Sequence, residues 1–304
     1  MLKWEPASDN PYRYRTGELK MVTATQPRTV CELKQMTPEE QYFYDVNGYL
    51  VVENAIEPDL LRRILEWTAP LEAEARERIE RMGPGENRDY IFEDILNTET
   101  RLVELVANPT IVPYLNEMIE CPRLKSTWLT YKLKHGRTGA HSNHTPTRTC
   151  DYYHFNGRIY HNLFQVFYAL DDIGPGEGAL QVIPGSHKAN FPLPENDAFV
   201  EKLCIEVHQP RGSALLFSHD CHHRSYNHSD KMRKTLIFTY CPGVIANSYG
   251  TDALYERLFE ESPEHSWQKY LLRSPNGYRE TYPCPVDNPW VRQGAPKNYS
   301  AGKK

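Results

Sequence analysis

The sequence of 304 residues lacks long apolar runs, runs of basic residues and closely paired cysteines. No stretch approaches the roughly 18 apolar residues of a membrane span, and the N-terminal residues lack the apolar core of a signal peptide. Lysine and arginine are dispersed and the net charge is only -5, so the basic footprint of a nucleic-acid-binding domain is missing. We therefore expect a cytoplasmic protein with neither a membrane nor a nucleic acid as partner.

The seven cysteines are scattered and never form a Cys-x-x-Cys pair, which argues against a disulfide framework and a structural zinc site. They are typical of free thiols in a reducing compartment. What the chain does contain is an ordinary globular composition, 39% hydrophobic and 25% charged, which predicts a core of normal size.

Changes of pattern divide the chain into an irregular N-terminal arm at 1–36 and a single domain at 37–304, which begins with a helical part at 37–123. Thr37-Pro38-Glu39-Glu40 is a capping box, so a helix should run from Pro38 to about Asn47. Apolar spacing predicts further elements in this part: a strand at 49–52, a helix at 58–81 that Pro70 kinks or splits, and helices at 99–107 and 110–119.

The pattern then changes to short alternating or apolar runs bounded by turn residues, which is typical of an all-β sandwich or barrel. This β-core spans 124–243, and a helical tail follows at 244–304. The predicted fold class is mainly β with flanking helices. The runs lie at 125–134, 158–170, 179–183, 203–208, 213–217 and 233–241, and the tail helices at 252–259 and 267–272.

Histidine is concentrated in the predicted β-core, where eleven of the twelve histidines fall between His135 and His228. Two histidines and one carboxylate form the facial triad of non-haem iron oxygenases, which leaves positions open for cosubstrate and oxygen. The concentration favours an iron site of this kind, although most of the eleven histidines must have structural roles.

Residues 166–188 read VFYALDDIGPGEGALQVIPGSHK, a strand that ends in an acidic pair, followed by a glycine-rich turn and a Pro-Gly-Ser-His-Lys segment. This order resembles the phytanoyl-CoA dioxygenase family, and the likeness covers roughly residues 38–243. The resemblance implies a double-stranded β-helix, or jelly roll, of the cupin-like type. It also implies Fe(II) and 2-oxoglutarate as cofactors, with ascorbate as a further reductant, and a structural role for His187.

Two further site residues follow from the resemblance. The family's distal iron-binding histidine lies six residues past the aromatic end of a strand, here Phe217, which selects His223. Counting backward from Asn227 favours the neighbouring His222 instead, and both readings stay open. Arg233 matches the family's arginine that holds the distal carboxylate of 2-oxoglutarate, for which a guanidinium offers bidentate geometry.

The proximal half of the triad departs from the family, because no His-x-Asp or His-x-Glu stands in the expected region. The family's subgroup that carries the 152–158 pattern places its first histidine about eleven residues earlier, on His141. Asn143 then replaces the carboxylate, His154 could supply a third imidazole, and Asp151 is a carboxylate nearby. The Asn156-Gly157 pair predicts a hairpin turn.

Three outcomes follow from this departure: an iron site with three histidines or with His-Asn-His, a site that leaves a position open for halide, and a catalytically dead site. The favoured hypothesis is an oxygenase that hydroxylates an unactivated C–H bond of a small molecule. The alternatives are a halogenase and a non-catalytic jelly-roll binding protein. No motif selects the substrate or the oligomeric state.

Overall fold

The structure is a computed structural model that describes residues 36–83, 85–142, 152–155, 157–245 and 252–275. Nearly all of the predicted N-terminal arm lies outside these ranges, so the domain boundaries stay a prediction. The parts described contain no helix long and apolar enough to cross a membrane.

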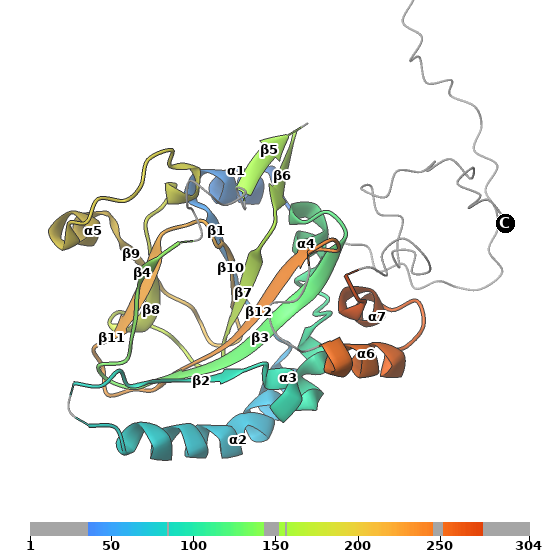
Figure 1. The fold of residues 1–304 in the computed structure, drawn as a ribbon, viewed down its shortest axis with the longest axis horizontal. Helices are drawn as coiled ribbons and strands as arrows, with labels where there is room; N and C mark the ends of the chain where they lie inside the picture. The colour runs from blue at the N-terminus through green and yellow to red at the C-terminus, as the bar shows by residue number, and fades with distance from the viewer. Residues whose placement is uncertain (1–35, 84, 143–151, 156, 246–251, 276–304) are drawn as a thin grey trace, which may run out of the picture. The chain divides into compact units, whose positions relative to one another are not determined.

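Ten strands form two antiparallel sheets that face each other (Figure 1). The large sheet has the order β1-β10-β7-β12-β3-β2, with bounds Tyr49–Val52, Ala214–Ser218, Phe164–Ala169, Arg233–Pro242, Pro122–Lys132 and Asp89–Glu93. The small sheet has the order β4-β11-β8-β9, with bounds Arg137–His141, His223–Asn227, Glu177–Val182 and Ile205–Val207.

Alternation along the strands of the large sheet sends side chains to two different cores. Phe167 and Leu215 face the small sheet and pack in one cluster with its Leu180 and Val182. The neighbouring residues face outward into a second, larger cluster that includes side chains of the helices. The interior between the two sheets is therefore a separate compartment, and the candidate site lies in it.

The helices begin and end largely where the sequence predicts. Thr37 forms the expected capping box of α1 (Pro38–Asn47), and Gly48 ends it in the left-handed conformation with φ +79°. Pro70 does not split α2 (Pro58–Glu80), which is one continuous helix. The helix predicted at 99–107 is wrong: Glu99 leaves the helical conformation and separates α3 (Ile95–Thr98) from the 3₁₀ helix η1 (Thr100–Leu105).

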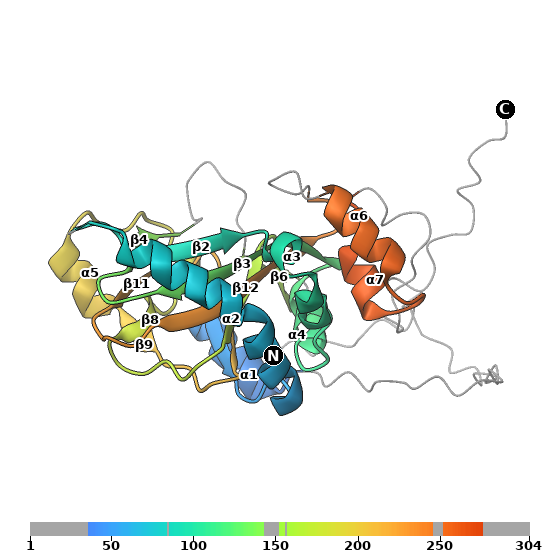
Figure 2. The same cartoon turned by 90° about the horizontal axis from the view of Figure 1, so that it is seen from below.

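The remaining helices are α4 (Val112–Met118), η2 (Ser186–Lys188), α5 (Asp197–Leu203), α6 (Asp252–Glu261) and α7 (Trp267–Leu272). Figures 1 and 2 show α2, α3, α6 and α7 on the outer side of the large sheet, away from the small sheet. Helices α6 and α7 confirm that the described part of the C-terminal tail is helical, as predicted.

The predicted strands are present, but the run at 158–170 forms two strands rather than one. β6 (Arg158–His161) pairs with β5 (Tyr152–Phe155) in a separate hairpin, whereas β7 pairs with β10 and β12. Phe155 and Arg158 are register partners, and Gly157 has φ +76°, as a tight hairpin connection requires. The hairpin prediction is confirmed.

Candidate metal centre and cosubstrate site

Three histidines meet at one end of the space between the sheets. His141 is the last residue of β4, His223 is the first residue of β11, and the two are register partners across the strands. His219 lies in the short connection between β10 and β11. One ligand nitrogen from each of these three side chains lies within 4.8 Å of the others. We call this group the histidine trio.

The trio extends from the core to the surface. His223 is buried at 5% exposure, His219 is half-buried and His141 is exposed. The ring centroids of His141 and His223 lie 4.0 Å apart, and those of His219 and His223 lie 5.8 Å apart. Phe217 packs edge-on against His223 from the inner face of β10. The trio is therefore packed against the core at His223 and exposed to solvent at His141.

Backbone contacts set which ring nitrogen of two trio members is available. Nδ1 of His223 lies 2.8 Å from the carbonyl oxygen of Cys221, and Nδ1 of His141 lies 2.8 Å from that of Gly139. A carbonyl oxygen only accepts, so each Nδ1 must carry the proton and donate it. The Nε2 lone pair of each ring is left for a metal, which is the usual arrangement of a metal-binding histidine.

The electrostatic surroundings keep His223 neutral. Burial lowers the pKa of His223 well below its ordinary value, and the neighbouring His141 lowers it further. A neutral imidazole is the form that binds metal, so a metal at this position does not have to displace a proton near neutral pH.

Arg233, predicted as the cosubstrate residue, is the first residue of β12 and is buried at 5% exposure. Its side chain reaches across to the small sheet, where a Cβ atom on Gly178 would lie only 3.3 Å from its Cδ. Burial lowers the pKa of Arg233 to about 10, although Asp89 acts in the opposite direction. The buried Nε and Nη2 atoms have no hydrogen-bond partner among the described residues.

A second buried cation lies beside Arg233, and the sequence did not reveal it. Lys132, at the end of β3, is the register partner of Arg233 and is 1% exposed. Its Nζ forms an ion pair with Asp89 at 3.0 Å and donates to Ser225 Oγ and Thr138 Oγ1. Burial lowers the pKa of Lys132 to about 8. We call Lys132 and Arg233 the cation pair.

Ser225 connects the cation pair to the histidine trio. It lies two residues after His223 on β11, so both side chains point to the same face, about 7 Å apart along the strand. Lys132 Nζ donates to Ser225 Oγ from the opposite sheet at 2.5 Å. The trio and the cation pair therefore share one interior.

Apolar side chains form the inner wall of the large sheet between these two groups. Trp128, Ile237 and Phe167 are register partners across β3, β12 and β7. Trp128 and Ile237 are only half-buried although their strands lie inside the large sheet. Exposed apolar surface at this position could contact the apolar part of a ligand.

The other residues singled out in the sequence do not join the trio. His154 is an exposed residue of the β5–β6 hairpin, paired with Ile159. His222 is half-buried, and its backbone N–H donates to Ser186 Oγ. His187 packs edge-on against Tyr152 and contacts the carbonyl oxygen of Asp45, which is a structural role. Asn143 and Asp151 lie outside the described residues.

Asp220 fastens the hairpin to the histidine connection. It directly follows His219, is 2% exposed, and accepts a hydrogen bond of 2.6 Å from the backbone N–H of Tyr152. The Tyr152 ring packs against His161 and His187, and its hydroxyl donates to Asp45. One buried carboxylate thus holds both the start of β5 and the segment that carries His219.

His219 is the member of the trio that sequence reasoning missed. The family resemblance selects one distal histidine by its distance from Phe217, and that rule passes over a histidine only two residues beyond Phe217. The available signal was the combination of three histidines within five residues and the missing proximal carboxylate. Because the proximal carboxylate ligand is missing from the sequence, an additional histidine near the distal one becomes a candidate to replace it.

The fold is shared with several crystal structures of low sequence identity. HygX from Streptomyces hygroscopicus with nickel, 2-oxoglutarate and hygromycin B bound matches with a TM-score of 0.58 and 20% identity, covering 70% of this chain and 90% of that one. EctD from S. alaskensis in its apo form matches with a TM-score of 0.53 and 17% identity over 70% and 79% of the two chains.

The epimerase SnoN, in complex with Fe3+, alpha ketoglutarate and nogalamycin RO, matches with a TM-score of 0.52 and 16% identity over 69% of this chain and 84% of that one. These likenesses confirm the predicted jelly-roll fold. No curated protein matches the sequence. The family model of phytanoyl-CoA dioxygenase matches residues 44–235, well over half of the chain. The chain therefore belongs to the phytanoyl-CoA dioxygenase family of iron- and 2-oxoglutarate-dependent oxygenases.

Proposed function

We propose that this protein is an Fe(II)- and 2-oxoglutarate-dependent oxygenase that hydroxylates an unactivated C–H bond of a small molecule. The observation that carries the proposal is the shared interior, with three imidazoles at one end and, at the other, a buried guanidinium whose Nε and Nη2 have no hydrogen-bond partner among the described residues. Imidazole nitrogen is a ligand type suited to iron, and the two buried cations Arg233 and Lys132 have only the one carboxylate of Asp89 beside them, which favours binding of a further anion.

The donor set fits iron with His141, His219 and His223 as protein ligands. In this proposal His219 takes the place of the carboxylate that the family's triad would supply. Asn143 stays a further candidate that could offer a neutral amide oxygen, and His154, an exposed residue of the hairpin outside the trio, stays a candidate third imidazole. When bound, iron with 2-oxoglutarate and oxygen supplies the oxidising power, and the protein supplies binding and orientation.

The cation pair fits the distal carboxylate of 2-oxoglutarate. Arg233 would donate charge-assisted hydrogen bonds through nitrogen atoms that now lack a partner. Lys132 adds positive charge, and Ser225 and Thr138 hold its ammonium group in place. A cosubstrate anchored there would extend toward the trio.

The chain's own side chains exclude water and orient the reactants. Phe217 supports the His223 ring, and Phe167, Leu180 and Val182 fill the space behind it. The half-buried Trp128 and Ile237 would contact the apolar part of a bound molecule. HygX holds hygromycin B and SnoN holds nogalamycin RO, which supports a small-molecule substrate here without identifying it.

A halogenase is the second candidate function, because no carboxylate of a described residue joins the three histidines in the candidate metal site. If only His141 and His223 bound the metal and His219 did not, a halide could occupy the metal position that a carboxylate usually takes. The diagnostic change is Asn143→Asp. A switch from chlorination to hydroxylation in that variant would identify a halogenase, whereas unchanged hydroxylation would exclude it.

The deciding experiment is anaerobic titration of Fe(II)-loaded protein with 2-oxoglutarate, observing the weak visible charge-transfer band of the chelate. We expect one chelate per chain. Arg233→Ala should raise the 2-oxoglutarate concentration for half-saturation about 10- to 100-fold, since a hydrogen bond to a charged group contributes about 1.5 to 3 kcal/mol.

Arg233→Lys should recover part of the affinity, and Arg62→Ala, which removes an exposed helix arginine, should leave it unchanged. No band in the iron-loaded wild-type protein would contradict the oxygenase proposal. An unchanged 2-oxoglutarate requirement in Arg233→Ala would remove that residue from the site.

A further inference from the structure

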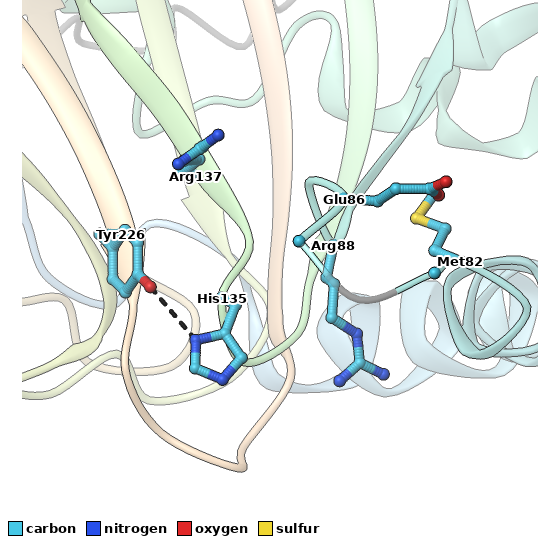
Figure 3. A pocket seen from close by; sticks show the side chains of 8 residues that line it. Met82, Glu86, Arg88, His135, Arg137 and Tyr226 are labelled. Carbon is cyan, nitrogen blue, oxygen red and sulfur yellow. Dashed lines mark hydrogen bonds between the residues drawn. The ribbon is translucent and has the colours of Figure 1, made fainter.

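A cavity opens at the other end of the small sheet from the histidine trio. It has a volume of about 570 Å³, within the range of small-molecule sites, and Figure 3 shows its lining. We call it the rear pocket; its side chains come from Met82, Glu86, Arg88, His135, Arg137 and Tyr226. Arg137 begins β4 and His141 ends it, so the two sites lie about 13 Å apart along the strand.

The rear pocket lies where the edges of the two sheets meet. β2 is the edge strand of the large sheet and β4 is the edge strand of the small sheet. Asn87 joins them, because its side-chain amide donates to the Arg137 carbonyl at 2.8 Å and accepts from the Arg137 N–H at 2.7 Å. The Leu133 N–H donates to the Arg88 carbonyl at 3.0 Å.

The turn that carries His135 is held firmly. His135 has φ +71°, a left-handed conformation that few non-glycine residues adopt, and its N–H donates to the Asn227 carbonyl at 2.8 Å. A Cβ on Gly136 would lie 2.5 Å from the Arg88 carbonyl oxygen, so the backbone approach requires glycine. The hydroxyl of Tyr226 lies 3.2 Å from His135 Nδ1 and fixes the ring (Figure 3). The pocket is therefore preformed.

Positive charge predominates in the rear pocket. Arg88 and Arg137 form no ion pair or side-chain hydrogen bond with any residue that the structure describes. The one acidic lining residue, Glu86, extends toward Met82 and away from Arg88 in Figure 3. Met82 and the Tyr226 ring supply apolar contact. Two unpaired guanidinium groups beside an apolar surface favour a ligand that is both anionic and partly apolar.

We propose that the rear pocket is an accessory binding site for a small organic anion, with an oxyanion group held by Arg88 or Arg137 and an apolar body against Met82 and Tyr226. The site is distinct from the proposed cosubstrate site, because Lys132 and Arg233 point into the interior between the sheets. It does not depend on the proposed oxygenase activity.

Phenyl phosphate is a suitable probe, since it combines a phosphate with an apolar ring. Isothermal titration of the purified full-length protein should show saturable binding to one site. Arg88→Ala/Arg137→Ala should weaken binding at least tenfold. Arg62→Ala/Arg257→Ala removes the same charge from exposed, ion-paired helix positions and should bind like wild type. Both double variants replace exposed or half-buried side chains, and thermal unfolding checks that they fold.

Three results would overturn the proposal. One is the absence of saturable phenyl phosphate binding to the wild-type protein. Another is a loss of binding in Arg233→Ala but not in Arg88→Ala/Arg137→Ala, which would place the anion at the cosubstrate site. The third is equal affinity for phenol, which would show that the pocket does not select an anion. None of these results bears on the iron titration, so the two proposals fail separately.

Discussion

At the scale of single residues, the three histidines of the trio differ in what fixes them. His141 and His223 stand on paired strands, and each has its Nδ1 held by a backbone carbonyl. His219 belongs to a connection whose position depends on Asp220. The trio therefore combines two imidazoles that are held rigidly with one that is positioned through a neighbour.

His219 gives the sharpest test of the ligand set. We expect His219→Ala and His223→Ala to lose most bound iron, because a three-histidine site has no carboxylate in reserve. His154→Ala should keep full iron content, and His208→Ala, an exposed histidine paired with Glu206, serves as the control. Iron per chain after anaerobic loading is the measurement. Loss of iron in His154→Ala with retention in His219→Ala would show that the hairpin histidine is the ligand.

Lys132 makes cosubstrate binding depend on pH. Burial lowers its pKa to about 8 in the free protein, so its positive charge is present below pH 8 and is lost as the pH rises above 8. The 2-oxoglutarate dissociation constant should therefore increase several-fold between pH 7 and pH 9, because anion binding is linked to the protonated form. Arg233, with a pKa of about 10, keeps most of its charge over this interval.

Lys132→Met removes the titrating group and should give weaker 2-oxoglutarate binding with a flat dependence between pH 7 and pH 9. The same titration of the chelate band measures both proteins. An equally steep pH dependence in Lys132→Met would assign the effect to another group.

At the scale of secondary-structure elements, the β5–β6 hairpin depends on Asp220. Asp220→Ala should release the Tyr152 N–H, move the connection that carries His219, and change the environment of the metal. We expect a shifted charge-transfer band and a lower turnover number, with the 2-oxoglutarate requirement nearly unchanged because the substitution leaves both cations of the pair in place. Asp220→Asn keeps an acceptor oxygen and should restore much of the wild-type spectrum. If Asp220→Ala lowered the stability of the protein but kept the wild-type charge-transfer spectrum, the role of Asp220 would be structural only.

The elements that were predictable are those with a local signal. The capping box and Gly48 define α1 by backbone hydrogen bonding alone, and the apolar runs identify β7, β10 and β12. The strands β4 and β11 were not predicted as strands from their pattern, since Arg-Thr-Gly-Ala-His and His-Arg-Ser-Tyr-Asn are polar and do not alternate. Their pairing with each other creates the edge of the small sheet, and such a long-range contact leaves little trace in either segment.

The same limit explains which residues of the candidate site could be proposed from the sequence. Arg233 and His223 follow from family spacing, because each has a fixed offset from a recognisable strand. Lys132 belongs to a run that predicts a strand, yet nothing in that run shows that its ammonium group meets Ser225 from the other sheet. His219 likewise becomes a candidate only when β4 and β11 bring His141 beside His223.

At the scale of the whole molecule, the proposed metal and cosubstrate should stabilise each other. Three imidazole ligands would bring no negative charge to Fe(II), and the cation pair outweighs the single carboxylate of Asp89 in the same interior. The dianion 2-oxoglutarate would offset both positive charges. Bound iron should therefore raise the affinity of the protein for 2-oxoglutarate, and bound 2-oxoglutarate should raise its affinity for iron by the same factor.

This coupling is measurable in the unfolding temperature, since a ligand that binds only the native state stabilises it by RT ln(1 + [L]/Kd), about 2.7 kcal/mol at a hundredfold excess over Kd. We expect anaerobic thermal unfolding to show a small shift with Fe(II) or 2-oxoglutarate alone and a shift of several degrees with both, larger than the sum. In Arg233→Ala the shift with iron alone should persist and the excess with both ligands should disappear. Strictly additive shifts in the wild-type protein would mean that the metal and the cosubstrate do not share one site.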